Sequence, residues 1–324
     1  MDNKNVKKIA VLTSGGDAPG MNAAVRAVVR SSLNNGLEVY GIRDGYYGLV
    51  NNDIFQMKRK DVTDILTRGG TILGTARLPE FAEKAVQEKG ANNLKALGID
   101  GLVVVGGDGS YRGALGLTDF GIKCIGIPGT IDNDIASTEY TIGFDTAVHT
   151  AVDAIDKLRD TCNSHQRCSI IEVMGRYCGD IAFAAGIACG ADKIITSETG
   201  FDENELINYI KERKHTVHRH LLIVITEHIT DTIALAKKVR EETGWDSRAT
   251  VLGHIQRGGS PSPFDRILAT RLGEAAVESL LSGENSECLG VQNNEIIRTP
   301  FKECFDKKKN VFYKYAIDLN NQVR

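Results

Sequence analysis

The chain lacks any apolar run near the roughly 18 residues that a membrane-spanning helix requires. Its polar first residues, 1–8, lead directly into the short apolar stretch 9–12, with no signal-peptide hydrophobic region. We therefore expect neither a membrane span nor a secretory leader.

The sequence also offers little for disulfides or for long-range electrostatics. The seven cysteines are odd in number and scattered, without a C-x-x-C pair, which is typical of reduced thiols in a cytosolic protein. The expected location is therefore cytoplasmic. The formal net charge is only −3, so nucleic acid and membrane surfaces are not expected as partners. Any phosphate chemistry must come from local basic clusters.

Proline is scarce, with six residues, and no repeat or low-complexity linker marks a domain boundary. At 324 residues the chain has room for two ordinary domains or for one large α/β domain. Composition does not show where a boundary lies, and the chain can cross between lobes more than once.

The sequence does contain a regular alternation of short apolar runs with helical patterns. Helices are predicted, for example, over 21–33 and 146–159, the second because apolar residues recur there at helical spacing. This βαβα order predicts an α/β fold with parallel sheets covered by helices on both faces. The predicted strands are 8–13, 38–42, 101–105, 124–127, 168–173, 221–226 and 250–255.

Three glycine-rich segments follow predicted strands. The first, 13–20, joins a strand to a helix. Its glycines would let the backbone approach a ligand, and the helix start would offer N–H groups to a phosphate. A connecting turn without a ligand explains this segment about equally well.

The second segment, 106–110, places Asp108 among glycines at a carboxyl strand end, where open α/β sheets bind ligands. Asp108 suits a Mg²⁺ ion that carries nucleotide phosphates. A competing interpretation is that Asp108 caps the next helix. The flanking glycines favour the ligand. Neither of these two segments is a P-loop, and no clean G-x-G-x-x-G occurs.

The third segment, 128–134, holds Thr130, Asp132 and Asp134 within five residues. Two neighbouring carboxylates perturb each other's titration, as expected of a working acid or base. Taken alone, however, an Asp-Asn-Asp loop is more often a turn.

Taken together, the ordered motifs are far more specific than any one of them. The segments TSGGDAPGMN (13–22), GGDGS (106–110) and PGTIDND (128–134) resemble the bacterial ATP-dependent 6-phosphofructokinases. The match continues through RGGT (68–71), MGR (174–176) and GHIQRGGSP (253–261), and it weakens only after about residue 293.

The resemblance implies a two-lobed, doubly wound subunit of a homotetramer. The nucleotide-binding lobe would be 1–143 plus 256–306, and the sugar-phosphate lobe 144–255 plus 307–324. The implied activity is a glycolytic transferase that passes the ATP γ-phosphate to the 1-hydroxyl of fructose 6-phosphate, with Mg²⁺.

By the same resemblance Asp132 is the general base for the sugar hydroxyl, a role open to a carboxylate within hydrogen-bond reach of it. Thr130 would bond the transferring phosphoryl group, and Asp134 would support the loop. Arg176 would supply fixed positive charge, and Asp108 would hold the metal. The implied ATP site is Gly16, Tyr46, Arg77, Leu78, Gly107, Asp108, Gly109 and Ser110.

In the implied sugar-phosphate site, Arg167 and Arg248 reach in from a neighbouring subunit, and their forked guanidinium groups suit a phosphate. The other members would be Thr130, Ile131, Asp132, Met174, Gly175, Arg176, Glu227, His254, Ile255, Gln256 and Arg257. Without the family match, four of these would be interpreted as ordinary surface or packing residues: Arg167, Glu227, Arg248 and His254.

Two glycines favour ATP as the donor. The pyrophosphate-dependent relatives carry Asp and Lys where this chain has Gly109 and Gly129, and an acidic side chain at the first would crowd the α-phosphate. A NAD-kinase-like or lipid-kinase enzyme shares a Gly-Gly-Asp-Gly turn, but it would not explain 128–134 or 253–261. A catalytically dead nucleotide sensor would be expected to have lost Asp132 or Asp108.

Arg26 and Arg30 are four residues apart, hence on one face of a predicted helix. They match the family's effector pocket for ADP or phosphoenolpyruvate, although a solvated basic face would explain them too. The remaining implied members are Arg59, Asp64, Arg159, Gly190, Asp192, Thr216, His218 and His220.

This pocket departs from the family at three positions. The family typically has lysines where this chain has Thr216 and His218, and often Glu in place of Asp192. We therefore expect weakened control by both effectors, with partial recovery at acidic pH if His218 becomes charged. A metal site at His215, His218 and His220 is disfavoured by the basic residues around it.

Overall fold

The computed structural model describes residues 6–214, 220–284, 286–306 and 318, and the chain divides into two compact units. Unit 1 consists of the described parts of Met1–Ile131, Ile135–Thr146 and Arg257–Lys309. Unit 2 consists of the described parts of Asp132–Asp134, Ala147–Gln256 and Asn310–Arg324. The chain therefore changes unit within the predicted catalytic segment. The predicted return of the tail to the second lobe falls almost entirely outside the described residues.

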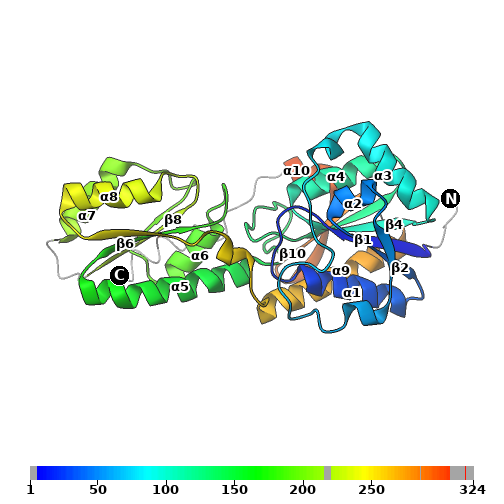
Figure 1. Ribbon diagram of the computed structural model, residues 1–324, viewed down its shortest axis with the longest axis horizontal. Helices are drawn as coiled ribbons and strands as arrows, with labels where there is room; N and C mark the ends of the chain where they lie inside the picture. The colour runs from blue at the N-terminus through cyan, green and yellow to red at the C-terminus, as the bar shows by residue number, and fades with distance from the viewer. Residues whose placement is uncertain (1–5, 215–219, 285, 307–317, 319–324) are drawn as a thin grey trace. The chain divides into compact units, whose positions relative to one another are not determined.

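Unit 1 is built on a seven-stranded sheet with the order β11-β10-β5-β4-β1-β2-β3 (Figure 1). Strands β1, β4 and β5 are parallel and lie in the middle of the sheet, whereas β3 and β11 pair antiparallel at its two edges. The strands are β1 (Lys8–Thr13), β2 (Glu38–Ile42), β3 (Ile54–Met57), β4 (Gly101–Gly106), β5 (Lys123–Pro128), β10 (Glu287–Gln292) and β11 (Glu295–Pro300).

Helices cover both faces of this sheet, as the alternating pattern predicts. One face is covered by α2, α3, α4 and α10, and the other by α1 and α9, which pack closely together (Figure 1). The helices are α1 (Met21–Asn34), α2 (Gly45–Val50), α3 (Lys84–Ala96), α4 (Asp108–Thr118), α9 (Pro263–Ser282) and α10 (Phe301–Asp306), with the short 3-10 turns η1 (Arg59–Val62) and η2 (Pro79–Ala82).

Unit 2 is a four-stranded parallel sheet with the order β7-β8-β6-β9. Its core lies between the sheet and α7 and α8, while α5 and α6 lie on the opposite face (Figure 1). The strands are β6 (Cys168–Val173), β7 (Lys193–Ile195), β8 (Leu221–Thr226) and β9 (Ser247–Val251); the helices are α5 (Phe144–His165), α6 (Asp180–Ala188), α7 (Glu203–Lys214) and α8 (Thr232–Thr243), and η3 (Gly253–Arg257) follows β9.

One predicted strand is wrong. The segment 250–255 is not a continuous strand, because β9 ends at Val251 and a 3-10 turn begins at Gly253. Its spaced apolar residues resemble a strand, but Gly253 has a φ of 56°, which an extended chain does not adopt. Val251 and Ile255 are exposed rather than buried, so their pattern does not mark a core face.

None of the helices in the described parts of the chain has the length and apolarity that crossing a membrane would require.

Candidate active site

Three loops leave the same edge of the unit 1 sheet. Strands β1, β4 and β5 are parallel neighbours, so their carboxyl ends lie side by side. The loop backbones are joined by hydrogen bonds: Ser14 N donates to Val105 O at 2.9 Å, and Gly129 N donates to Gly106 O at 3.0 Å. The three glycine-rich segments singled out in the sequence thus start together at the position where open α/β sheets bind ligands.

Glycine is required where these loops approach one another. A Cβ added to Gly106 would lie 2.5 Å from the Ser14 carbonyl oxygen, a contact that real side chains do not make. A Cβ on Gly107 would lie 4.0 Å from Thr130 Cβ, so the second and third loops are in van der Waals range. The absence of side chains therefore allows the backbone of one loop to face the other.

Asp108 is the first residue of α4, and Gly107 occupies the N-cap position without a side-chain cap hydrogen bond. Asp108 therefore lies in the first turn of the helix and not at the N-cap position. Asp108 and Gly109 are exposed, and no atom lies within 4 Å of a Cβ built on Gly109. The first turn of a helix has N–H groups without intrahelical acceptors, so this end of α4 suits a phosphate.

Tyr46 supports the second loop from inside the core. Its ring stacks on Phe81 with a centroid distance of 4.1 Å, and its hydroxyl donates to the Ser110 carbonyl at 2.5 Å. Burial raises the pKa of Tyr46 well above its usual value. Tyr46 thus fixes the backbone at Ser110. A contact of Tyr46 with a nucleotide stays a prediction. Of the other predicted nucleotide ligands, Leu78 packs against the core and Arg77 is exposed.

The 68–75 segment ties the first loop in place, although none of its residues has a predicted individual role. Thr13 Oγ1 lies 2.8 Å from Thr71 Oγ1 and donates to the Gly74 carbonyl at 2.7 Å. Thr75 Oγ1 donates to the Gly15 carbonyl at 2.8 Å. The RGGT motif and the residues after it therefore hold the glycine-rich loop 13–20 in place. The presence of RGGT among the matched motifs could have suggested such a role.

Residues 67–69 also contact Asn22, at the end of the first motif, and Ser260, in the motif at 253–261. The Asn22 amide donates to the carbonyls of Arg68 and Gly69 at 3.0 and 3.2 Å. Ser260 Oγ donates to the Thr67 carbonyl at 2.7 Å. Three motifs that are far apart in the sequence thus form one interlocked structure within unit 1.

Arg257 is brought against the first loop. A Cβ on Gly16 would lie 3.6 Å from Arg257 Cζ, so the guanidinium covers this glycine. Gly16 was predicted to bind nucleotide and Arg257 to bind sugar phosphate. The structure places the two residues side by side in unit 1.

The third loop is anchored in both units. Thr141 Oγ1 donates to the Thr130 carbonyl at 2.6 Å within unit 1. Asn133 has a φ of 51°, and its amide donates to Asp180 Oδ2 at 2.7 Å within unit 2. Between these anchors lies Asp132, only 5% exposed. The sequence did not identify this contact of Asn133, because its buried partner is 47 residues away.

A second group of predicted residues gathers at the carboxyl ends of β6 and β8. Glu227 Oε1 accepts hydrogen bonds from Gly175 N at 3.2 Å and Arg176 N at 2.9 Å. These two residues have φ values of 135° and 53°, so the carboxylate holds a turn that the backbone would not adopt readily. The turn presents the Arg176 side chain to solvent.

Gln256 is buried beside this turn. Its Oε1 accepts from Met174 N at 3.3 Å, and its Nε2 donates to the Gly253 carbonyl at 3.0 Å. Both the oxygen and the nitrogen of the Gln256 side-chain amide are thus hydrogen-bonded to backbone groups. His254 and Ile255 are both exposed on η3.

Arg167 and Arg248 are not near the Met174–Arg176 turn. Arg167 precedes β6 and Met174 follows it, and β6 pairs with β9 through Ser169 and Arg248. A strand rises about 3.3 Å per residue, so roughly 20 Å separate the two ends of β6. The predicted sugar-phosphate ligands of unit 2 therefore form two separate groups.

The predicted effector residues are distributed over both units. In unit 1, Arg26 and Arg30 are half-buried on α1, and burial and the charge of Arg30 lower the pKa of Arg26. Arg59, in η1, contacts the last residue of α1, because its Nη2 donates to Asn34 Oδ1 at 2.5 Å. Asp64 follows η1 with a φ of 59°.

In unit 2, Asp192 has a structural partner. Its Oδ2 accepts from Leu222 N at 2.8 Å, which fixes the start of β8. Gly190 has a φ of 56° after α6, Arg159 is half-buried on α5, and His220 precedes β8. Thr216, His218 and His215 lie outside the described residues. Over the part of the chain that the structure covers, no three His, Cys, Asp or Glu side chains gather in a way that could hold a metal ion.

Comparison with known proteins agrees with this arrangement. The family model described as Phosphofructokinase matches residues 8–280. An ATP-dependent 6-phosphofructokinase of Photobacterium profundum is 55% identical over 318 residues, which cover 98% of this chain and 99% of that protein. One of Mannheimia succiniciproducens is 54% identical over 319 residues, with the same coverage.

Solved structures with the same fold were also found. A phosphofructokinase from Saccharomyces cerevisiae superposes with a TM-score of 0.85 at 36% identity, over 98% of this chain. This chain spans about half of the yeast chain, 47%. A pyrophosphate-dependent phosphofructokinase from Marinobacter aquaeolei, at 23% identity and a TM-score of 0.83, shares the fold over 94% of this chain and 85% of that one.

Proposed function

The chain belongs to the phosphofructokinase family, and we propose that it is an ATP-dependent 6-phosphofructokinase that acts in glycolysis. The observation that carries this proposal is the pairing of β4 with β5, which starts the loop of Asp108 and the loop of Thr130 at neighbouring positions. One loop suits a nucleotide phosphate, and the other continues to the nearly buried carboxylate of Asp132, which supports a role in phosphoryl transfer.

Asp132 is proposed to be the general base. The 1-hydroxyl oxygen of fructose 6-phosphate attacks the γ-phosphorus of ATP, and a new O–P bond forms. The bond from that phosphorus to the β–γ bridging oxygen breaks, so ADP leaves, and the hydroxyl proton passes to the Asp132 carboxylate. The hydrogen bonds to Thr130 and from Asn133 fix the backbone on either side of this carboxylate.

The donor set fits Mg²⁺ bound with the nucleotide. Asp108 is an exposed carboxylate at the mouth of the glycine loop, and Mg²⁺ is usually held by one or two carboxylates plus phosphate oxygens. Asp108 would hold the ion, which when bound neutralises charge on the phosphates. The chain itself supplies fixed positive charge through Arg77 and Arg176, and Gly16 and Gly107–Ser110 would cradle the phosphates.

ATP is the proposed donor rather than pyrophosphate. Gly109 faces open space, so a nucleotide α-phosphate can approach its backbone. The relatives from Photobacterium profundum and Mannheimia succiniciproducens are ATP-dependent 6-phosphofructokinases by name, and they support the same donor.

The sugar phosphate is proposed to bind between residues of two subunits. Met174–Arg176, Glu227, His254 and Arg257 would come from one chain. Because roughly 20 Å of β6 separate that turn from Arg167, Arg167 and Arg248 would contact the phosphate bound by a neighbouring chain. This division supports an oligomer, in which such contacts recur by symmetry, and the family resemblance implies a homotetramer.

The effector pocket is proposed to be present but weak. Arg26, Arg30 and Arg59 supply cationic groups for ADP or phosphoenolpyruvate. Asp192 is engaged by the backbone of β8, so it offers less to an effector. Thr216 and His218 stand where the family has lysines, which is the reason for expecting weaker control.

An assay coupled to aldolase tests the reaction. The purified chain should form fructose 1,6-bisphosphate from fructose 6-phosphate with ATP and Mg²⁺, and much less with pyrophosphate in place of ATP. Equal turnover with pyrophosphate would overturn the donor assignment. No bisphosphate with either donor would favour a nucleotide sensor over an enzyme.

A further inference from the structure

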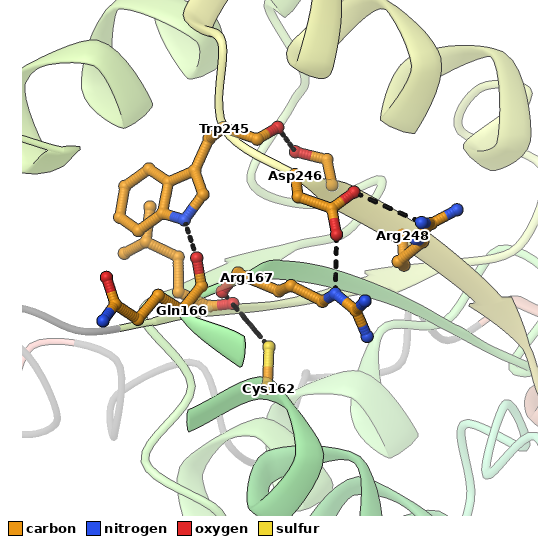
Figure 2. A network of polar contacts seen from close by, with 8 residues as sticks. Cys162, Gln166, Arg167, Trp245, Asp246 and Arg248 are labelled. Atoms are coloured by element: carbon orange, nitrogen blue, oxygen red, sulfur yellow. Dashed lines mark hydrogen bonds and ion pairs between the residues drawn. The ribbon is translucent and has the colours of Figure 1, made fainter. Parts of the chain in front are cut away.

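Three charged side chains meet at the end of the unit 2 sheet that is remote from the Met174–Arg176 turn (Figure 2). Arg167 Nε donates to Asp246 Oδ2 at 2.6 Å, and Arg248 Nη2 lies 3.4 Å from Asp246 Oδ1. Each carboxylate oxygen thus faces a different guanidinium. The Arg167, Asp246 and Arg248 side chains are 29%, 39% and 57% exposed, so the cluster is accessible to a ligand.

The backbone around this cluster is fixed by contacts between two distant segments (Figure 2). The buried Trp245 donates from its indole Nε1 to the Gln166 carbonyl at 2.5 Å. Cys168 N donates to the Asp246 carbonyl at 3.0 Å, and Cys168 pairs with Ser247 in the parallel β6–β9 ladder. These contacts fix the backbone on which both arginines lie, at the junction of the segments 166–168 and 245–248. The backbone contacts do not determine how the two arginine side chains are oriented.

Asp246 sets the charge balance of the junction. Two guanidinium groups side by side would repel each other, and one carboxylate between them leaves these three side chains a net charge of +1, to which the nearby Arg240 adds positive charge, so the cluster suits an anion. The hydrogen bond from Arg167 lowers the pKa of Asp246 below its usual range, so the carboxylate is ionised at neutral pH. A guanidinium has five N–H donors, so the contacts with Asp246 engage only part of them.

Stabilisation of the fold does not explain the arrangement well. Ion pairs with this exposure contribute about 1 kcal/mol or less, because water screens them. The backbone junction is already held by the indole and by the strand ladder. Asp246 contacts both guanidinium groups at once, an arrangement that can orient them together and that packing does not require.

We propose that Asp246 is a positioning residue that holds the guanidinium groups of Arg167 and Arg248 as a pair for the phosphate of the sugar substrate. The inference rests on the proposed function, in which both arginines contact that phosphate. Asp246 itself does not contact the substrate. It acts through the two arginines.

Steady-state kinetics of Asp246→Asn test this role. The KM for fructose 6-phosphate should rise roughly three- to tenfold, the scale of one exposed charge interaction or slightly more, with kcat and the KM for ATP within about twofold. Asp246→Glu keeps the charge and should recover most of the affinity. Asp53→Asn is the matched control, because Asp53 pairs with Arg43 at 3.3 Å with comparable exposure in unit 1. It should leave both KM values unchanged.

A double-mutant cycle shows whether Asp246 acts through the arginines. In an Arg167→Ala/Arg248→Ala background, Asp246→Asn should cause no further rise in KM for fructose 6-phosphate. A rise by the same factor in that background would overturn the proposal. So would an unchanged KM in the single variant, or a parallel change in both KM values and the melting temperature, which would indicate a structural role. If the wild type forms no fructose 1,6-bisphosphate at all, the proposed function fails first, so the two failures are distinguishable.

Discussion

Gly106 at the end of β4 pairs with Pro128 at the end of β5. The loops that follow these two residues carry Asp108 and Asp132, the proposed metal ligand and the proposed base. The pairing of β4 with β5 starts these two loops at neighbouring positions of the sheet, as a shared ligand site at its carboxyl edge requires.

Gly109→Asp should weaken ATP binding without affecting stability. The added side chain has open space around it, so the melting temperature should stay within a degree or two. Its negative charge next to the proposed phosphate site should raise the KM for ATP about tenfold or more. Gly109→Asn has nearly the same size and no charge, and it should have a much smaller effect. Equal effects of Asp and Asn would show that charge is not the cause.

Gly129→Lys should lower the free energy of unfolding. A Cβ at this position would lie 3.0 Å from Val105 Cγ1 and 3.1 Å from Met21 Cε, so buried neighbours must move. Overpacking of this kind costs about 1–3 kcal/mol, which urea denaturation can measure. Gly109→Lys, at the open position, is the control and should unfold like the wild type. A Gly129→Lys protein of unchanged stability would contradict the crowding seen here.

Much of the fold follows from local pattern. Strands β1, β2, β6 and β8 have the predicted bounds; β1 and β8 are almost fully buried apolar runs, as expected of parallel strands inside a sheet. Strands β3, β7, β10 and β11 were not predicted; β3 and β11 are partly exposed edge strands with weaker patterns. The positive φ of Gly253, which ends the segment 250–255 as a strand, is not visible in hydrophobicity.

The candidate site, like the fold, was predicted from the sequence only in part. Motif order identified its loops, and the structure confirms that the strands before them are neighbours. The contacts that position the loops were missed, because they depend on tertiary structure. Asn133 reaches Asp180, and Asp246 lies between two arginines whose pairing no sequence pattern indicates.

Glu227 should be important for its acceptor oxygen more than for its charge. Glu227→Ala removes the two hydrogen bonds that hold the Gly175–Arg176 turn, so the KM for fructose 6-phosphate should rise about tenfold or more. Glu227→Gln retains a carbonyl oxygen in the same place and should be impaired several-fold less. If Gln and Ala are equally impaired, the charge of Glu227 is what the enzyme requires.

Asp265 should make stability depend on pH. Its carboxylate is fully buried and accepts hydrogen bonds from Gly143 N at 2.8 Å, Thr146 N at 2.8 Å and Thr146 Oγ1 at 2.5 Å. Burial outweighs these bonds and raises the pKa from 3.8 to about 6. The folded state therefore binds the proton more tightly than the unfolded state, and the stabilisation by this group is lost as pH rises from about 4 to about 6.

The comparison with Asp265→Asn isolates that effect. The variant should be less stable overall, because an amide cannot accept all three bonds. The difference in unfolding free energy between wild type and variant should be largest near pH 4 and smaller at pH 7, as measured by urea denaturation. A difference that grows with pH would show that the carboxyl is ionised in the folded protein throughout this range.

The central claim is that Asp132 accepts the proton of the sugar hydroxyl, and the turnover of Asp132→Ser with saturating ATP, Mg²⁺ and fructose 6-phosphate tests it most directly. The account predicts that kcat falls by about two orders of magnitude or more, while the melting temperature stays close to that of the wild type. A correctly folded variant that retains more than about a tenth of the wild-type kcat would contradict it.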